Sequence, residues 1–168
     1  YWGRFYDIPC LMQRCAQLRI KCSLGRDGSP PYILKREFER RGKGKIEHKI
    51  RINGRVHFDV QKEVDADYSL TLAGIKDRKL KTVAKYFGLN PVEAPADKPI
   101  HELPMEELRR YNLSDARCTY QLAQIYLANL LELAEYFNVP LSMIIDRNPS
   151  HLGNFSYGRE YFKKDIIS

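Results

Sequence analysis

The stretch from Met105 to about Phe137 has the pattern of one long helix, and it limits the fold more than any other segment. The pattern ends at Asn138-Val-Pro140, because proline lacks the backbone N–H that a helix interior needs. Near its start, Tyr111 and Asp115 have the i, i+4 spacing that puts two side chains on one helix face. The sequence therefore predicts a helix that presents a phenol beside a carboxylate.

A second acid, Asp7, stands immediately before another segment with helical periodicity. Apolar side chains recur there at the spacing of one helix face: Ile8, Leu11, Met12, Cys15 and Leu18. An aspartate at this place can cap the helix, and Pro9 is tolerated in its first turn. Two acids and a tyrosine from separate helices also suit a site that holds divalent metal ions and orients a water molecule. Two simpler roles stay open, in which Asp7 is only an N-cap and Tyr111 only covers its helix.

The sequence lacks one component of such a metal site. Phosphodiester hydrolysis with two metal ions needs carboxylates from several elements, since one short segment cannot surround two ions. No Asp-x-Glu lies on an apolar strand. The nearest imitation is Asp65-Ala-Asp67, which falls in a polar stretch that we expect to be a loop with solvated acids. The residues thus predict only part of a nuclease site.

Between Tyr32 and Ile52, two strand-like runs flank a basic, glycine-bearing centre, Arg40-Arg-Gly-Lys-Gly-Lys45, which predicts a β-hairpin. Clustered lysine and arginine side chains neutralise phosphates whatever the base sequence, so this arm is the candidate contact with DNA. The alternative is a solvated edge strand protected by its lysines. The central candidates are Arg40, Arg41, Lys43 and Lys45; further basic residues are Lys35, Arg36, Lys49 and Arg51, and the acids that dilute the patch are Glu37, Glu39 and Glu47.

Other segments give simpler patterns. Asn53-Gly54 predicts a tight turn, and Arg55-Val-His-Phe-Asp-Val60 predicts a strand with alternate apolar residues. A short amphipathic helix is expected around Leu80–Phe87, and a proline-containing connector follows it. After residue 140 we expect a short apolar piece, a loop and a polar aromatic tail that is partly disordered or packed on a neighbour. The mixture indicates an α/β or α+β fold, with helices packed on the faces of a sheet.

The composition fits one globular domain with a polyanionic partner. The 168 residues can bury a core, and the net charge of +7 favours nucleic acid as that partner. The four cysteines form no Cys-x-x-Cys pair, and we expect buried, reduced thiols; the four histidines have no metal-ligand spacing. With no 18-residue apolar run and no signal peptide, we expect a cytoplasmic protein that has no contact with a membrane. Because the first residue is Tyr1 and not Met, we expect a fragment.

Taken in order, these blocks resemble the 3′–5′ exonuclease domain of family-B DNA polymerases, most closely those of archaea. Tyr1-Trp-Gly-Arg-Phe-Tyr-Asp7 is similar to the second exonuclease motif, and Tyr111-Asn-Leu-Ser-Asp115 is similar to the third, Tyr-x-x-x-Asp. Three intervening segments also resemble the family, namely a loop, a strand and a helix: Leu24–Pro31, Gly54–Val60 and Leu80–Gly88.

The resemblance implies a fold and a parent protein. The fold is the ribonuclease-H-like α/β fold of such exonucleases, truncated at its N-terminal strands and with a β-hairpin insertion. Residues 1–137 would be a partial exonuclease domain, and residues 138–168 would lead toward the polymerase palm. The parent would be a DNA-directed DNA polymerase that extends primers and removes mispaired 3′ ends with two Mg2+ or Mn2+ ions. Its partners would be DNA, both the primer 3′ end and single strands, and the rest of the polymerase chain.

The resemblance also assigns the catalytic residues. Asp7 and Asp115 match metal-binding carboxylates, and Tyr111 matches the tyrosine that positions the attacking water. Trp2 departs from the family, because an indole cannot reproduce the hydrogen bonds of the usual asparagine amide. The first motif, Asp-x-Glu, is absent, so the fragment alone is expected to be inactive. An editing-defective domain kept for structure and DNA binding is the alternative, and an unrelated basic α/β binding module is a third.

Overall fold

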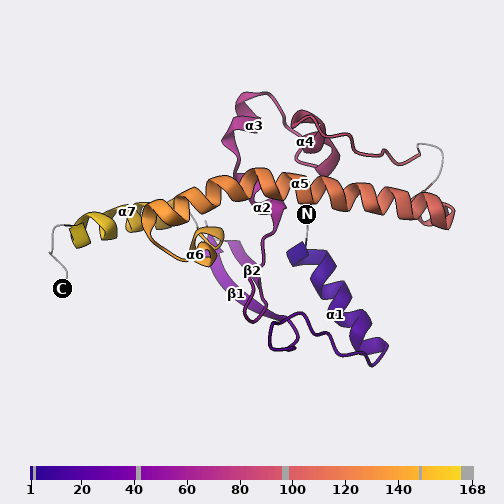
Figure 1. Ribbon diagram of the computed structural model, residues 1–168, viewed down its shortest axis with the longest axis horizontal. Coiled ribbons are helices and arrows are strands. Elements are labelled where there is room, and N and C mark those ends of the chain that lie inside the picture. Colours follow the sequence, from indigo (N-terminus) through magenta and orange to yellow (C-terminus); the bar gives the residue numbers. More distant parts are fainter. Residues whose placement is uncertain (2, 41–42, 96–98, 148, 164–168) are drawn as a thin grey trace. The chain divides into compact units, whose positions relative to one another are not determined.

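The computed structural model describes residues 1, 3–40, 43–95, 99–147 and 149–163, which are mainly helical (Figure 1). Within these residues, one antiparallel sheet of two strands accompanies the helices: β1 (Tyr32–Arg40) and β2 (Lys43–Arg51). The helical elements are the π-helical η1 (Gly3–Asp7), α1 (Ile8–Gln17), α2 (Val60–Ala66), α3 (Tyr68–Leu72), α4 (Leu80–Tyr86), the 3-10 η2 (Ile100–Glu102), α5 (Met105–Phe137), α6 (Leu141–Ile145) and α7 (Pro149–Lys163). The chain therefore has mixed α and β structure. None of the helices in this part of the chain is both long and apolar enough to cross a membrane.

The described residues form two compact units. The first unit contains Tyr1 and Val60–Asn129, and the second unit contains the described residues of Trp2–Asp59 and Leu130–Ser168. Helix α5 contributes residues to both units, because the boundary falls within it. Each unit has buried apolar residues of its own: Val60, Val64, Leu70, Val83 and Leu122 in the first, and Ile50, Leu130, Ile144 and Ile145 in the second.

In the first unit, Asp67 joins α3 to α5. Its carboxylate accepts a hydrogen bond of 2.9 Å from the Ser69 backbone N–H, which caps α3 at its first turn. The same side chain accepts a hydrogen bond of 2.7 Å from the Tyr126 hydroxyl on α5. The Tyr126 ring also meets the Phe87 ring edge-on, with 5.9 Å between the ring centres. These contacts hold the segments on either side of α4 against the long helix.

In the second unit, β1 and β2 pair along their whole length, from Tyr32 opposite Arg51 to Arg40 opposite Lys43. The next turn is made by Asn53-Gly54, where the Arg55 N–H donates to the Ile52 carbonyl at 3.0 Å. Gly54 has a φ of +68°, a conformation that favours glycine, and a Cβ there would meet the Arg26 side chain at 3.0 Å. The hairpin and the tight turn that the sequence predicts are both confirmed.

The apolar core of the second unit forms where α5 ends. Asn138, with a φ of +53°, ends the helix, and Pro140 precedes α6. The buried Leu130, Ala134, Ile144 and Ile145 then form a cluster; the half-buried residues packed against it are Phe58, Leu133, Phe137, Val139, Leu141 and Phe155. The predicted long helix, its end and the short apolar piece after it are confirmed, as is the short helix that became α4.

The prediction of a strand around Asp59 is wrong. Arg55–Val60 forms no strand: an isolated bridge joins Ile52 to Arg55, and α2 begins at Val60. The alternation that suggested a strand has other causes, since Phe58 packs against the core cluster while Val56 is about half exposed. The sheet of the described residues has two strands, and the ribonuclease-H-like fold stays a prediction.

Three smaller predictions are also corrected. Asp65-Ala-Asp67 is not a loop, since its first two residues end α2 and Asp67 caps α3. The tail forms α7, and its Phe155 packs against the Phe137 ring with 5.8 Å between ring centres. The cysteines are free thiols, but Cys118 alone is buried, whereas Cys10 is exposed. Because glycines separate the aromatic residues of the tail, its sequence shows no clear helical periodicity.

Candidate functional site

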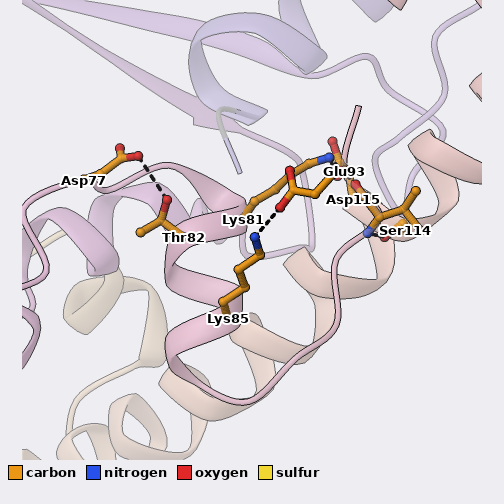
Figure 2. Close-up of polar contacts among 8 residues, drawn as sticks. Asp77, Lys81, Thr82, Lys85, Glu93, Ser114 and Asp115 are labelled. Carbon is orange, nitrogen blue, oxygen red and sulfur yellow. Dashed lines mark hydrogen bonds and ion pairs between the residues drawn. The ribbon is translucent and has the colours of Figure 1, made fainter. Parts of the chain in front are cut away.

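Tyr111 and Asp115 lie one turn apart on α5 in the first unit, as the sequence predicts. Both line a cavity of about 350 Å3 together with Lys81, Lys85 and Glu93. The two lysines come from α4, and Glu93 comes from the connector that follows it. Figure 2 shows the lysines, Glu93 and Asp115 gathered at this place. The cavity therefore brings together charged side chains from three segments of the chain.

The ammonium group of Lys81 lies beside both predicted site residues. Its Nζ is 3.7 Å from Asp115 Oδ1 and 3.8 Å from the centre of the Tyr111 ring. It also donates a hydrogen bond to the Val92 carbonyl oxygen. A carboxylate and the face of an aromatic ring both attract a cation. The lysine thus takes the position that a cation would occupy next to the Tyr111–Asp115 pair.

The surrounding contacts alternate in charge and fix the connector. Lys85 Nζ is 2.5 Å from Glu93 Oε1, so each of the two lysines has a carboxylate partner (Figure 2). Ser114, next to Asp115, accepts a hydrogen bond of 2.8 Å from the Val92 backbone N–H. The segment carrying Val92 and Glu93 is therefore attached to α5 at the site itself.

The Asp115 carboxyl is unusual for a surface helix. Burial raises its pKa above the ordinary value, while Lys81 and the Tyr111 hydroxyl oppose the shift and Glu93 adds to it. Its Oδ1 is buried and has no hydrogen-bond partner among the described residues, since 3.7 Å to Lys81 exceeds hydrogen-bond length. A desolvated carboxylate oxygen without a donor is suited to a cation.

Asp7 belongs to the second unit. It ends η1 and occupies the N-cap position of α1, but its exposed side chain makes no capping hydrogen bond, so the predicted capping role is wrong. Its Oδ2 is 4.0 Å, and His57 Nε2 3.2 Å, from the position where a Cβ on Gly3 would lie. The small residue of the motif therefore sits close to the Asp7 carboxylate and an imidazole. The convergence of Asp7 with Asp115 stays a prediction.

The residues in hand do not by themselves fit a two-metal centre. In the part of the chain that the structure describes, no group of three or more His, Cys, Asp and Glu side chains could hold a metal ion. Asp115 has an available oxygen, yet an ammonium group already stands near it. Binding of Mg2+ or Mn2+ stays a prediction that needs further carboxylates and a displacement of Lys81.

The predicted DNA-binding residues lie at the closed end of the hairpin. Arg40 ends β1 and pairs with Lys43, which begins β2, and Lys45 pairs with Phe38. The backbone thus places these three basic residues next to the turn that the sequence predicts. Arg41 and Trp2 lie outside the described residues.

The sequence reading missed Lys81, Lys85, Glu93 and Ser114. The apolar periodicity of Leu80–Phe87 predicts a helix, but it says nothing about the polar side of that helix. A signal was present: Lys81 and Lys85 have i, i+4 spacing, as do Tyr111 and Asp115. Two such pairs of opposite character on neighbouring helices indicate a shared polar interface, although spacing alone does not say which helices meet.

No known protein-family model matches the chain. It is nevertheless similar, over most of its length, to one class of curated proteins: DNA polymerases of the archaeal genera Thermococcus and Pyrococcus, at 25–29% identity.

Three of these relatives define the extent of the match. The DNA polymerase of Thermococcus litoralis is 29% identical over 138 residues, or 80% of this chain. The DNA polymerases of Pyrococcus glycovorans and Thermococcus sp. (strain 9oN-7) are 28% and 25% identical over alignments that cover all of it. The chain spans only 8% of the length of the first relative and 21% of each of the other two. The likeness is therefore to a limited section of a much longer polymerase.

Proposed function

We propose that the chain is part of a DNA-directed DNA polymerase and corresponds to its 3′–5′ proofreading exonuclease domain. The observation that supports this most is Tyr111 and Asp115 side by side at one cavity, with a buried Asp115 oxygen that has no hydrogen-bond donor among the described residues. The similarity to archaeal DNA polymerases over the whole chain supports the parentage. The parent would remove mispaired 3′ ends, and it would use two Mg2+ or Mn2+ ions.

Each residue has a proposed task in this reaction. Asp7 and Asp115 would hold the ions, and the Tyr111 hydroxyl would orient the attacking water. The basic hairpin end would contact the phosphates of the primer strand through Arg40, Arg41, Lys43 and Lys45. The first acidic motif is not in this sequence, so the 168-residue chain alone would hydrolyse DNA poorly.

A 3′-end degradation assay on the complete polymerase tests the proposal. The substrate is an end-labelled primer–template with one mismatched 3′ nucleotide, and the variants are Asp115→Ala and Tyr111→Phe. Loss of Asp115 should slow removal beyond the roughly 100-fold that loss of an outer-sphere partner costs. Glu106→Ala is the matched control, because Glu106 is an 85% exposed acid on the same helix that lines no part of the cavity. Equal, slow degradation by wild type and Asp115→Ala would refute proofreading.

A second candidate is an editing-defective domain kept for structure and DNA binding. Lys81 favours it, because an ammonium beside Asp115 competes with any metal ion for that carboxylate. Trp2, where the family has asparagine, favours it as well. Lys81→Met separates the candidates: it should raise Mn2+ affinity, measured by calorimetry, only if the lysine blocks the site. In that case Lys43→Glu with Lys45→Glu should still weaken DNA binding and lower its salt dependence.

A further inference from the structure

The second unit contains a larger cavity, of about 590 Å3, that shares no residue with the Asp115 site. Its walls come from the end of β2 and the turn after it, from α6 and from α7. This volume lies within the range of about 300–1,000 Å3 that is usual for small-molecule and cofactor sites. The cavity is therefore large enough for a ligand of nucleotide size.

Positive charge exceeds negative charge in the walls of this cavity. Lys49, Arg51 and Arg55 line it, whereas Asp146 is its one acidic lining residue in the part of the chain described. Asp146 is bound to Arg51, and this bond raises the pKa of the arginine. The acid is thus occupied within the wall, and the charges of Lys49 and Arg55 have no acidic counterpart among the lining residues.

The Arg55 side chain is held in place by contacts with the neighbouring backbone. Its Nε donates a hydrogen bond of 2.9 Å to the Leu24 carbonyl oxygen, which uses one of the five N–H donors of the guanidinium. The Asn53-Gly54 turn fixes the backbone immediately before it. A preformed guanidinium beside a lysine is well suited to phosphate, which accepts several charge-assisted hydrogen bonds at once.

The same cavity exposes apolar surface next to these cations. Val56 and Met143 line it and are 48% and 45% exposed. Phe155 completes an apolar side, and its ring is backed by Phe137. Ligand sites typically combine apolar and aromatic lining side chains with a few charged or polar groups that fix the ligand's orientation. The combination fits an anion that also has a flat apolar body.

We propose that this cavity binds a nucleotide unit, with the phosphate held by Lys49 and Arg55 and the base packed against Val56, Met143 and Phe155. The ligand would be either a free nucleotide or one nucleotide of a DNA single strand, since both present the same phosphate and base. This inference is independent of the proposed exonuclease function, because the cavity contains none of Asp7, Tyr111 and Asp115.

Binding to the full 168-residue chain tests the proposal, with three probes compared by calorimetry or fluorescence anisotropy. These are thymidine monophosphate, a dT12 oligonucleotide and an abasic oligonucleotide of the same length. Lys49→Met and Arg55→Gln should each weaken binding about tenfold, as loss of one hydrogen bond to a charged group does. Lys21→Met, which removes a positive charge of the same unit outside the cavity, should have little effect.

The source of the nucleotide and the role of the base follow from the same probes. Binding of the monophosphate identifies a free-nucleotide site, and binding of dT12 alone identifies a strand site. Met143→Ser and Val56→Ser should weaken dT12 binding and leave the abasic oligonucleotide unaffected. These exposed positions tolerate substitution, so the test does not depend on Arg55, which also supports the fold. Equal losses for Lys21→Met and Lys49→Met, or equal affinity for dT12 and the abasic strand, would overturn the proposal.

Discussion

The two units use charged side chains in opposite ways. In the first unit, Lys81 and Lys85 face Asp115 and Glu93 at the candidate exonuclease site. The third lysine of this cavity, Lys79, lies 3.9 Å from Asp77, so each lysine of the cluster has an acidic partner. In the second unit, the described residues that line the large cavity include Lys49, Arg51 and Arg55 but only one acid, Asp146. Because paired charges satisfy one another and surplus charges do not, the first cluster has its main energetic role within the fold. The second is available to a partner of opposite charge.

Burial separates the two clusters further. The Lys81 and Asp115 side chains are 18% and 30% exposed, whereas those of Arg51 and Asp146 are 37% and 27% exposed. Solvent screens a charge more strongly as its exposure rises, so Lys81 is less screened than Arg51. A carboxylate that the sequence predicts to bind metal is thus engaged here by a lysine that the motif does not include.

The largest expected effect is the loss of stability when a core residue of either unit is truncated. It tests whether the two units unfold independently. Leu122 in the first unit and Ile144 in the second are both fully buried. Replacing either with alanine should cost about 2–5 kcal/mol of unfolding free energy through the cavity left behind. If the units unfold separately, differential scanning calorimetry should give two transitions, with each variant lowering one of them. A single transition, lowered equally by both variants, would remove the basis for the comparison.

The second effect contrasts one lysine from each cluster. Lys81→Met should lower the unfolding free energy by about 1–3 kcal/mol, because it leaves the buried Asp115 oxygen without a nearby cation. Lys49→Met should change it by less than about 0.5 kcal/mol, since a surplus surface cation contributes little to stability. Urea unfolding of both variants measures the difference. The double variant Lys81→Met with Asp115→Asn should regain part of the loss, and equal effects of the two lysines would contradict the contrast.

Periodicity explains which parts of this fold could be predicted. The long helix from Met105, the hairpin and the short helix α4 each have a repeated local signal over many residues, and each was predicted. Arg55–Val60 offered only three alternating apolar residues, and tertiary packing of Phe58 overrode that weak pattern. The capping of α3 by Asp67 is a local contact with Ser69, but the second partner of this carboxylate, Tyr126 on α5, is one that no local pattern identifies.

The candidate site was likewise only partly predictable from the sequence. The i, i+4 spacing placed Tyr111 beside Asp115, because both positions are on one helix. Lys81 could not be placed there from sequence, since its position depends on how α4 and α5 meet. The second cavity was equally hidden, as its walls come from segments separated by about half of the chain. Composition indicated a polyanionic partner but not where the surplus charge would collect.

The third effect is on the pH dependence of stability, and it compares two acids of the first unit. Burial raises the folded-state pKa of Asp115, so its stabilising effect is fully present below its ordinary pKa of 3.8 and is lost as the pH rises through the raised value. For Asp67 burial also opposes ionisation, but hydrogen bonds from Ser69 and Tyr126 prevail and lower its pKa. Its stabilising effect is present above 3.8 and is lost as the pH falls through the lowered value.

Asparagine variants should therefore change the pH profile in opposite directions. As the pH rises from about 3 to about 7, the unfolding free energy of Asp115→Asn should increase relative to that of wild type. The unfolding free energy of Asp67→Asn should decrease relative to wild type over the same range. Urea unfolding at several pH values measures both slopes. Glu106→Gln is the control, because it replaces an exposed acid on the same helix as Asp115 that lies outside the cavity. The same sign of change for both aspartates would contradict the assignment of Asp115 as a desolvated carboxyl.

The smallest expected effect is the loss of the Arg51–Asp146 pair in the second unit. Asp146→Asn removes the acid that binds Arg51, and because the pair is partly exposed the loss should be only about 0.5–1 kcal/mol. The change also adds one more uncompensated cation to the cavity, so millimolar phosphate or thymidine monophosphate should restore stability more in this variant than in wild type. Thermal unfolding at increasing ligand concentration measures the recovery.

Lys81→Met is the comparison variant, because it alters charge in the other unit and should gain no more from these anions than wild type does. Recovery of the same size in all three proteins would mean that the anions act on the whole charged surface and not on this cavity.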